Sequence, residues 1–286
     1  SYGSPLSKFK DDTDGIGFYE VVRDIEEHFE EKKAELIQNL KQLSRQIFRV
    51  DNVMISYTSS EDGLAPMEAA FREIKDTLYP ELDGEEIPCV LHGRKRNEGF
   101  KTSSKVQYVA RVGNFIDHGA QYHGALQILK VILSYDYLWQ NVRVKGGAYG
   151  CMSNFNRIGE GYLISYRDPN LKKTMEVYEG VVDYLKNFTV DERDMTKYII
   201  GTISNIDRPM NPAAKGDRSM NLYMNHVSQE MIRTERSQIL HAAQEDIRAL
   251  AAVVEAMLKA EQICVIGSEE KIEEEKEMFL EVKTLF

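Results

Sequence analysis

The sequence contains few cysteines, and their spacing suits neither disulfides nor a metal cluster. Only three of its 286 residues are cysteine: Cys89, Cys151 and Cys264. They are odd in number, far apart, and form no Cys-x-x-Cys pair, so a disulfide framework is not expected. We therefore expect reduced thiols in a cytosol-like compartment. This would be the cytoplasm if the source is bacterial, or an organelle matrix if it is eukaryotic.

Long apolar runs and an excess of basic residues are also missing. No stretch approaches the roughly 18 apolar residues that a membrane helix needs. Basic residues number 36 against 46 acidic ones, giving a net charge of −10, whereas a nucleic-acid-binding protein needs a basic stripe. We expect no membrane and no nucleic-acid partner. The first residues lack both an initiator Met and the apolar core of a signal peptide, so we expect the chain to be part of a longer protein.

The motifs of several common catalytic sites are absent as well. A helix can hold zinc through His-x-x-Glu-His, which places two imidazoles and a general base around the metal. None of the six histidines builds this motif, and His118 and His123 are five residues apart with no acid between them. There is no Gly-x-Ser-x-Gly elbow and no Gly-rich phosphate loop. We expect no metal and no nucleophile in this chain.

One stretch does carry a candidate site, because two polar side chains flank a pair of glycines. Arg143 and Tyr149 are six residues apart, which is about 20 Å along a strand or about 600° around a helix. They can serve one small site only if the chain reverses between them. Gly146 and Gly147 allow this, since glycine tolerates positive φ. We expect a helix ending at Arg143, a turn at the glycines and a strand from Ala148.

A purely structural interpretation of the same residues stays open. Arg143 is favourably placed as a cation near the carbonyl end of a helix, and Tyr149 is a common strand aromatic.

Hydrophobic periodicity predicts an α+β fold in which helices pack on a mostly antiparallel sheet. In the first third of the chain we expect a helix over 18–47, a strand over 53–57 and a helix from about 66. Thereafter we expect strands over 105–112, 148–155, 161–166 and 263–266, and helices over 120–134, from 171, from 191, from 228, over 247–258 and over 268–279.

A helix–strand–helix order near Val53 returns near Ile263, about one domain length later. This suggests that residues 1–80 are the tail of a preceding domain, 81–103 are a linker, and 104–286 form a complete domain of similar fold. The alternative is coincidence, because helix–strand–helix is a common order.

Several segments, in order along essentially the whole chain, resemble the C-terminal part of one peptidase family. They look like the presequence-protease branch of the pitrilysin/insulinase zinc metallopeptidases, whose domains repeat one fold. The matching segments are 97–104, 107–110, 142–150, 165–171 and 207–209. In that family an Arg and a Tyr from the C-terminal half bind the substrate at the scissile bond. Arg143 and Tyr149 are the matching positions, with Gly146 and Gly147 in the loop between them.

The resemblance implies the substrate-binding half of a zinc-dependent endopeptidase that degrades short unfolded peptides. Its zinc would lie in an N-terminal catalytic half, the expected partner, so this chain would be inactive alone. A guanidinium and a neutral phenol both suit a peptide carbonyl that gains negative charge. The alternative is a non-catalytic subunit or scaffold, which has no need of both side chains.

Overall fold

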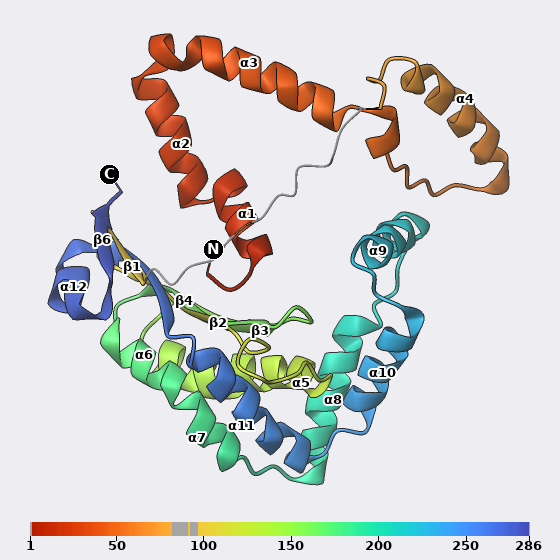
Figure 1. Ribbon diagram of the computed structural model, residues 1–286. Helices are drawn as coiled ribbons and strands as arrows, with labels where there is room; N and C mark the ends of the chain where they lie inside the picture. Colours follow the sequence, from red (N-terminus) through yellow and green to blue (C-terminus); the bar gives the residue numbers. More distant parts are fainter. Residues whose placement is uncertain (1, 82–90, 92–96, 286) are drawn as a thin grey trace. The chain divides into compact units, whose positions relative to one another are not determined.

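The computed structural model describes residues 2–81, 91 and 97–285, which fall into two compact units (Figure 1). One unit comprises Ser1–Lys10, Leu91–Arg208 and Gln229–Phe286, and contains the sheet. The other comprises Asp11–Val90 and Pro209–Ser228. Among the described residues, no helix has both the length and the apolar character needed to cross a membrane.

The sheet has six strands in the order β3-β4-β2-β5-β1-β6. Strand β2 is antiparallel to β4 and β5, and β3 is antiparallel to β4, whereas β1 is parallel to β5 and β6. The predicted α+β class with a mostly antiparallel sheet is confirmed. The strands are β1 (Glu98–Thr102), β2 (Gln107–Asn114), β3 (Gly150–Phe155), β4 (Glu160–Asp168), β5 (Gln262–Ser268) and β6 (Glu281–Thr284).

Helices cover one face of this sheet and build the core against it (Figure 1). Because strand side chains alternate between faces, Val109, Leu163 and Val265 all point into the core, each fully buried. The helical elements are α5 (Ala125–Ile132), the π-helical turns η3 (Leu133–Tyr137) and η4 (Trp139–Val144), α6 (Lys172–Glu179), α7 (Val181–Lys186), α8 (Glu192–Ile206), α10 (Gln229–Leu240), α11 (Gln244–Leu258), α12 (Glu269–Glu274) and the 3₁₀ turn η5 (Lys276–Met278).

Two helices of this unit begin at a capping side chain. The Asp191 carboxylate accepts from the Asp194 N–H at the start of α8 (2.8 Å), and the Ser268 hydroxyl accepts from the Lys271 N–H at the start of α12 (3.4 Å). The predicted last helix over 268–279 is too long, because α12 ends at Glu274 and the chain goes on through η5 to β6.

The linker expected over 81–103 contains a strand of the sheet. Strand β1 occupies residues 98–102 and pairs with both β5 and β6. Gly99 sits where a Cβ atom would lie 2.9 Å from the Ile272 side chain, so a residue that looks like a loop signal is a close-packing position in a strand. Residues 82–90 and 92–96 of the expected linker lie outside the described residues.

The second unit is helical in its described part, and two predictions fail there. The expected helix over 18–47 is two helices, α2 (Ile16–Glu27) and α3 (Phe29–Ile47), which meet at His28 (φ −120°, ψ 32°). The strand expected over 53–57 does not form. Its Met54 is 55% exposed, and a lone apolar segment without a neighbouring strand has nothing to pair with.

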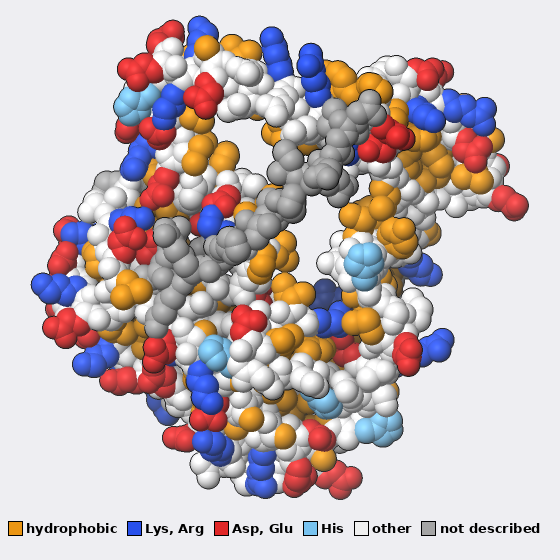
Figure 2. All heavy atoms as spheres, in the orientation of Figure 1, with side chains coloured by type: hydrophobic (Ala, Val, Ile, Leu, Met, Phe, Trp, Pro, Cys, Tyr) orange, Lys and Arg blue, Asp and Glu red, His pale blue; other side chains and the backbone are white. Residues whose placement is uncertain are grey.

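The remaining helical elements of this unit include the expected helix near residue 66. They are α1 (Pro5–Asp14), which begins in the first unit, the 3₁₀ turns η1 (Val50–Asn52) and η2 (Glu61–Gly63), α4 (Leu64–Lys75) and α9 (Pro212–Met224). On the face drawn in Figure 2, acidic and basic side chains are interspersed over the described residues.

Candidate functional site

The candidate site begins at the end of a long helical run, where the backbone changes from α-helical to π-helical. The run passes from α5 into the π-helical turns η3 and η4, and η4 ends at Val144, one residue after Arg143. The predicted helix end is therefore confirmed to within one residue. Single π-helical turns inside helices are uncommon and occur often at functional sites.

The chain reverses at the two glycines, as predicted. The Gly147 N–H donates to the Arg143 carbonyl oxygen (2.8 Å), and the Ala148 N–H donates to the Val142 carbonyl oxygen (3.1 Å). Gly147 has a φ of +84°, a region that favours glycine. A Cβ atom on Gly146 would lie 2.3 Å from the Val142 carbonyl oxygen, so this position also requires glycine.

A buried carboxylate holds this turn against the end of strand β4. Asp168 is fully buried, and its Oδ2 accepts from the hydroxyls of Ser165 (2.6 Å) and Thr174 (2.7 Å). Its Oδ1 accepts from the Asn170 N–H (2.9 Å), and the Asn170 side-chain amide donates to the Gly146 carbonyl oxygen (2.6 Å). The turn is thus fixed by hydrogen bonds that continue into the core.

The turn brings Arg143 and Tyr149 together. The guanidinium carbon of Arg143 lies 4.1 Å from the centre of the Trp139 ring and 6.0 Å from that of Tyr149. The Tyr149 ring also contacts Tyr166, at 5.5 Å between ring centres. Tyr149 is 59% exposed and Arg143 is exposed as well. Both polar groups are therefore available to a molecule that approaches from solvent.

A third polar residue belongs to the cluster, and sequence reasoning did not select it. The guanidinium carbon of Arg167 lies 5.5 Å from the Tyr149 ring centre, and the Arg167 carbonyl oxygen accepts from the Tyr149 N–H (3.3 Å). Arg167 has a φ of +48°, which costs a non-glycine residue about 1–2 kcal/mol. The matching segment 165–171 includes Arg167, but no periodicity or composition signal shows a left-handed backbone.

The three side chains form a surface of hydrogen-bond donors beside the buried Asp168 carboxylate, which is occupied by its own network. Neither Arg143 nor Arg167 has a carboxylate within ion-pair distance among the described residues. A guanidinium has five N–H donors and no acceptor, and a phenol can donate one more hydrogen bond. The arrangement suits an oxygen-rich ligand that carries or develops negative charge.

Cys151 follows this cluster in sequence but is poorly suited to act as a nucleophile. Burial raises the pKa of its thiol to about 11, although the positive charge of Arg143 acts in the opposite direction. The thiolate is the reactive form of cysteine, and very little of it exists near neutral pH.

We expect alkylation of Cys151 by iodoacetamide at pH 7.5 to be at least about 100-fold slower than that of an unperturbed thiol, in line with a pKa raised by about 2 units. The rate should rise as the pH approaches 11, because a raised thiol pKa delays ionisation. Mass spectrometry of the Cys151 peptide gives the rate, with free glutathione alkylated in the same reaction as the reference thiol. Labelling of Cys151 within minutes at pH 7.5 would contradict the assigned environment.

The described residues do not suit a zinc ion. They contain no group of three or more His, Cys, Asp or Glu side chains placed to hold a metal. His118 and His123 lie in the segment before α5 and have no such companions. His92 lies outside the described residues.

Comparison with known proteins places this chain in a family. Residues 97–269 match the family model of the PreP C-terminal domain, and this span runs from just before β1 to the first residue of α12. The chain belongs to the PreP C-terminal domain family. The resemblance to the presequence-protease branch of the pitrilysin/insulinase peptidases is thereby confirmed.

Two curated relatives show how this family member compares along its length. Protein HypA of Clostridium perfringens is 40% identical over 286 residues, which is all of this chain and 29% of HypA. Presequence protease 1, chloroplastic/mitochondrial, of Arabidopsis thaliana is 29% identical over 94% of this chain and 25% of its own length. The chain therefore spans less than a third of the length of either relative.

A solved structure has a similar fold. The peptidase M16 inactive domain from Pseudomonas fluorescens is 17% identical, with a TM-score of 0.47 over 71% of this chain and 50% of that chain.

Proposed function

We propose that this PreP C-terminal domain is the substrate-binding half of a zinc-dependent endopeptidase that degrades short unfolded peptides. In this proposal the metal and the general base belong to an N-terminal half outside this chain. The observation that carries the proposal is the exposed pair of Arg143 and Tyr149, held together by a glycine turn that the Asp168 network fixes.

Each exposed side chain has a distinct role in the proposal. Arg143 binds a backbone carbonyl of the peptide, and its position over the Trp139 ring at 4.1 Å holds the guanidinium in place. Tyr149 donates its phenolic hydrogen to the oxygen that becomes negative when the scissile carbonyl is attacked. Arg167, whose guanidinium carbon lies 5.5 Å from the centre of the Tyr149 ring, adds a positive charge near that oxygen. Such fixed donors stabilise a developing oxyanion more than they stabilise the neutral carbonyl.

The helical unit has an exposed apolar surface on α2 and α3 that suits packing against another part of the same parent protein. Large apolar side chains of α2 and α3 are between 44% and 56% exposed: Phe18, Val22, Phe29, Leu40, Leu43 and Ile47. An apolar stripe of this kind normally packs against another element. We propose that the N-terminal catalytic half supplies this element. A bacterial cytoplasm or an organelle matrix is the proposed location.

A scaffold without a catalytic role is less well supported. A scaffold would have no need of Arg167 in a left-handed backbone conformation. Nor would it need two guanidinium groups beside an exposed phenol that, among the described residues, have no carboxylate within ion-pair distance. Strained backbone at an exposed polar cluster is typical of functional sites.

The proposal is tested by reassembly. We expect the chain alone, and the whole of the parent upstream of this chain alone, which carries His-x-x-Glu-His in this proposal, to leave an unstructured fluorogenic peptide intact. The two together should cleave it. Zinc analysis should find the metal only with the N-terminal half. The covalently continuous parent serves as the positive control for folding. Cleavage by this chain alone, or a continuous parent that binds but never cleaves peptides, would refute the proposal.

A further inference from the structure

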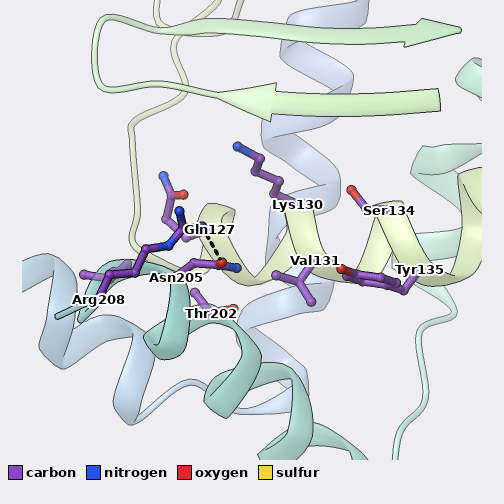
Figure 3. Close-up of a pocket in the computed structure, with 9 residues that line it drawn as sticks. Gln127, Lys130, Val131, Ser134, Tyr135, Thr202, Asn205 and Arg208 are labelled. Carbon is purple, nitrogen blue, oxygen red and sulfur yellow. Dashed lines mark hydrogen bonds between the residues drawn. The ribbon is translucent and has the colours of Figure 1, made fainter. Parts of the chain in front are cut away.

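A second polar site lies in the sheet-containing unit, in a cavity between α5 and α8. The cavity has a volume of about 560 Å³, within the range of about 300–1,000 Å³ typical of ligand sites. Its walls are mostly polar, and no acidic side chain lines it (Figure 3). The lining residues are Gln127, Lys130, Val131, Ser134, Tyr135, Thr202, Asn205, Ile206 and Arg208.

Two cations of this cavity are hydrogen-bonded to neutral side chains. The Lys130 ammonium donates to the Asn154 side-chain oxygen (3.1 Å), and the Arg208 guanidinium donates to the Asn205 side-chain oxygen (3.0 Å). Neither has a carboxylate within ion-pair distance among the described residues. An ammonium has three N–H donors and a guanidinium has five, so most of their donor capacity is unused.

The nearest acids in sequence are engaged elsewhere. Asp136 accepts a hydrogen bond from the Tyr198 hydroxyl (2.5 Å), and Asp207 pairs with Arg236. A cavity with two cations and no acid is unusual in a chain with a net charge of −10. In Figure 3, Arg208 turns back toward α5, and Lys130 extends from α5 toward the strands.

The carbonyl end of α8 opposes an anion here, but only weakly. A helix end acts as about half a negative charge, and the effect is confined to the last turn. The dipole accounts in part for Arg208, which follows the end of α8, but not for Lys130, which projects from α5. Two full positive charges outweigh it, so the cavity as a whole favours an anion.

The position of the cavity relates it to the candidate site. Lys130 and Arg143 lie on the same helical run, and Asn154, the partner of Lys130, lies on β3 five residues beyond Tyr149. Five residues of strand span about 17 Å. An extended peptide of about the same number of residues would therefore reach from Tyr149 to the cavity.

We infer that this cavity binds the C-terminal carboxylate of a peptide whose backbone lies over Arg143 and Tyr149. The inference rests on the proposed function, since it needs a peptide at that site. Lys130 and Arg208 supply the charge, and the hydroxyls of Ser134 and Tyr135 supply further donors. A terminal carboxylate is common to all unmodified peptides, so this contact selects for chain ends near the site and is independent of side-chain sequence.

The test compares two peptides that differ only at their C-terminus. An unstructured peptide of about ten residues with neutral side chains and an N-terminal fluorophore is made with a free carboxylate and as an amide. We expect fluorescence anisotropy with this 286-residue chain to show at least about tenfold tighter binding of the carboxylate, the effect expected for charge-assisted hydrogen bonds. Lys130→Gln and Arg208→Gln should each remove most of this preference, because they lower the affinity for the carboxylate much more than the affinity for the amide.

Lys173→Gln and Arg193→Gln are the matched controls, because they remove the same charges from exposed positions outside the cavity. Circular dichroism and melting temperature check that each variant is folded. Equal affinity of the two peptides, or equal loss in the controls, overturns the inference while leaving the proposed function intact. Failure of both peptides to bind the unmodified chain contradicts both.

Competition with inorganic phosphate distinguishes a site for a peptide's terminal carboxylate from a site for a free anion. Phosphate that competes with the carboxylate peptide more than with the amide supports the cavity as the carboxylate site. Phosphate binding that depends on Lys130, together with no difference between the peptides, shows a site for a free anion and overturns the assignment to a peptide end.

Discussion

Tyr149→Phe is expected to lower the kcat of the proposed peptidase by about 10²–10³, the usual effect of removing one donor from a developing oxyanion. The substitution keeps the ring, and with it the contacts to Tyr166 and to the two guanidinium groups. It removes only the phenolic hydroxyl of a side chain that is 59% exposed. The fold and the zinc content of the complete protein should therefore stay unchanged.

Steady-state kinetics on an unstructured peptide measure this effect, with KM and kcat determined separately. A fall in kcat with little change in KM identifies a contact made in the transition state. Tyr223→Phe is the matched control, because Tyr223 is 70% exposed and lies on α9 in the other unit. A kcat for Tyr149→Phe within about twofold of the unmodified enzyme would rule out the proposed role of Tyr149.

Asp168→Ala is expected to lower the free energy of unfolding by about 3–4 kcal/mol, because each buried group left without its partner costs about 1–3 kcal/mol. The carboxylate is fully buried and accepts from two hydroxyls and one backbone N–H. Its loss also frees Asn170, which holds the Gly146 carbonyl oxygen. The turn between Arg143 and Tyr149 should therefore loosen in the same variant.

Urea and thermal unfolding measure the change, and we expect a melting temperature lower by roughly 10 °C. Asp183→Ala is the matched control, since Asp183 is exposed on α7, and its effect should stay within about 0.5 kcal/mol. Asp168→Asn, which keeps the shape and one acceptor oxygen, should have an intermediate effect. If Asp168→Ala had the same melting temperature as the unmodified chain, the network would not hold the turn.

The sequence predicted those parts of the fold that depend on local pattern. The strand expected over 105–112 corresponds to β2, in which Val109 and not Tyr108 faces the core. Gly146 and Gly147 marked the reversal because few other residues fit there. Arg143 and Tyr149 could be expected to meet once this reversal was assumed. Local geometry was therefore sufficient to bring the central pair together.

The predictions that failed concern features that depend on contacts between residues distant in the sequence. Strand β1 is parallel to both of its neighbours, and its Gly99 fits close to Ile272 of α12, which no local pattern records. The segment 53–57 has strand-like composition but no neighbouring strand. Arg167 was not predicted as a site residue, because its position depends on a positive φ. The identity of a side chain other than glycine does not indicate a positive φ.

The π-helical turns before the site determine the direction in which its first cation points. Each π-helical turn accommodates one residue more than the regular spiral, and one residue corresponds to about 100° of rotation. One such turn, over Leu133–Tyr137, lies between α5 and Arg143, and Arg143 itself lies within the second, over Trp139–Val144. The direction of the Arg143 side chain around the helix axis therefore depends on the number of residues between α5 and Arg143. Deleting one residue from this run would turn the guanidinium away from Tyr149, even if every side chain of the cluster were kept.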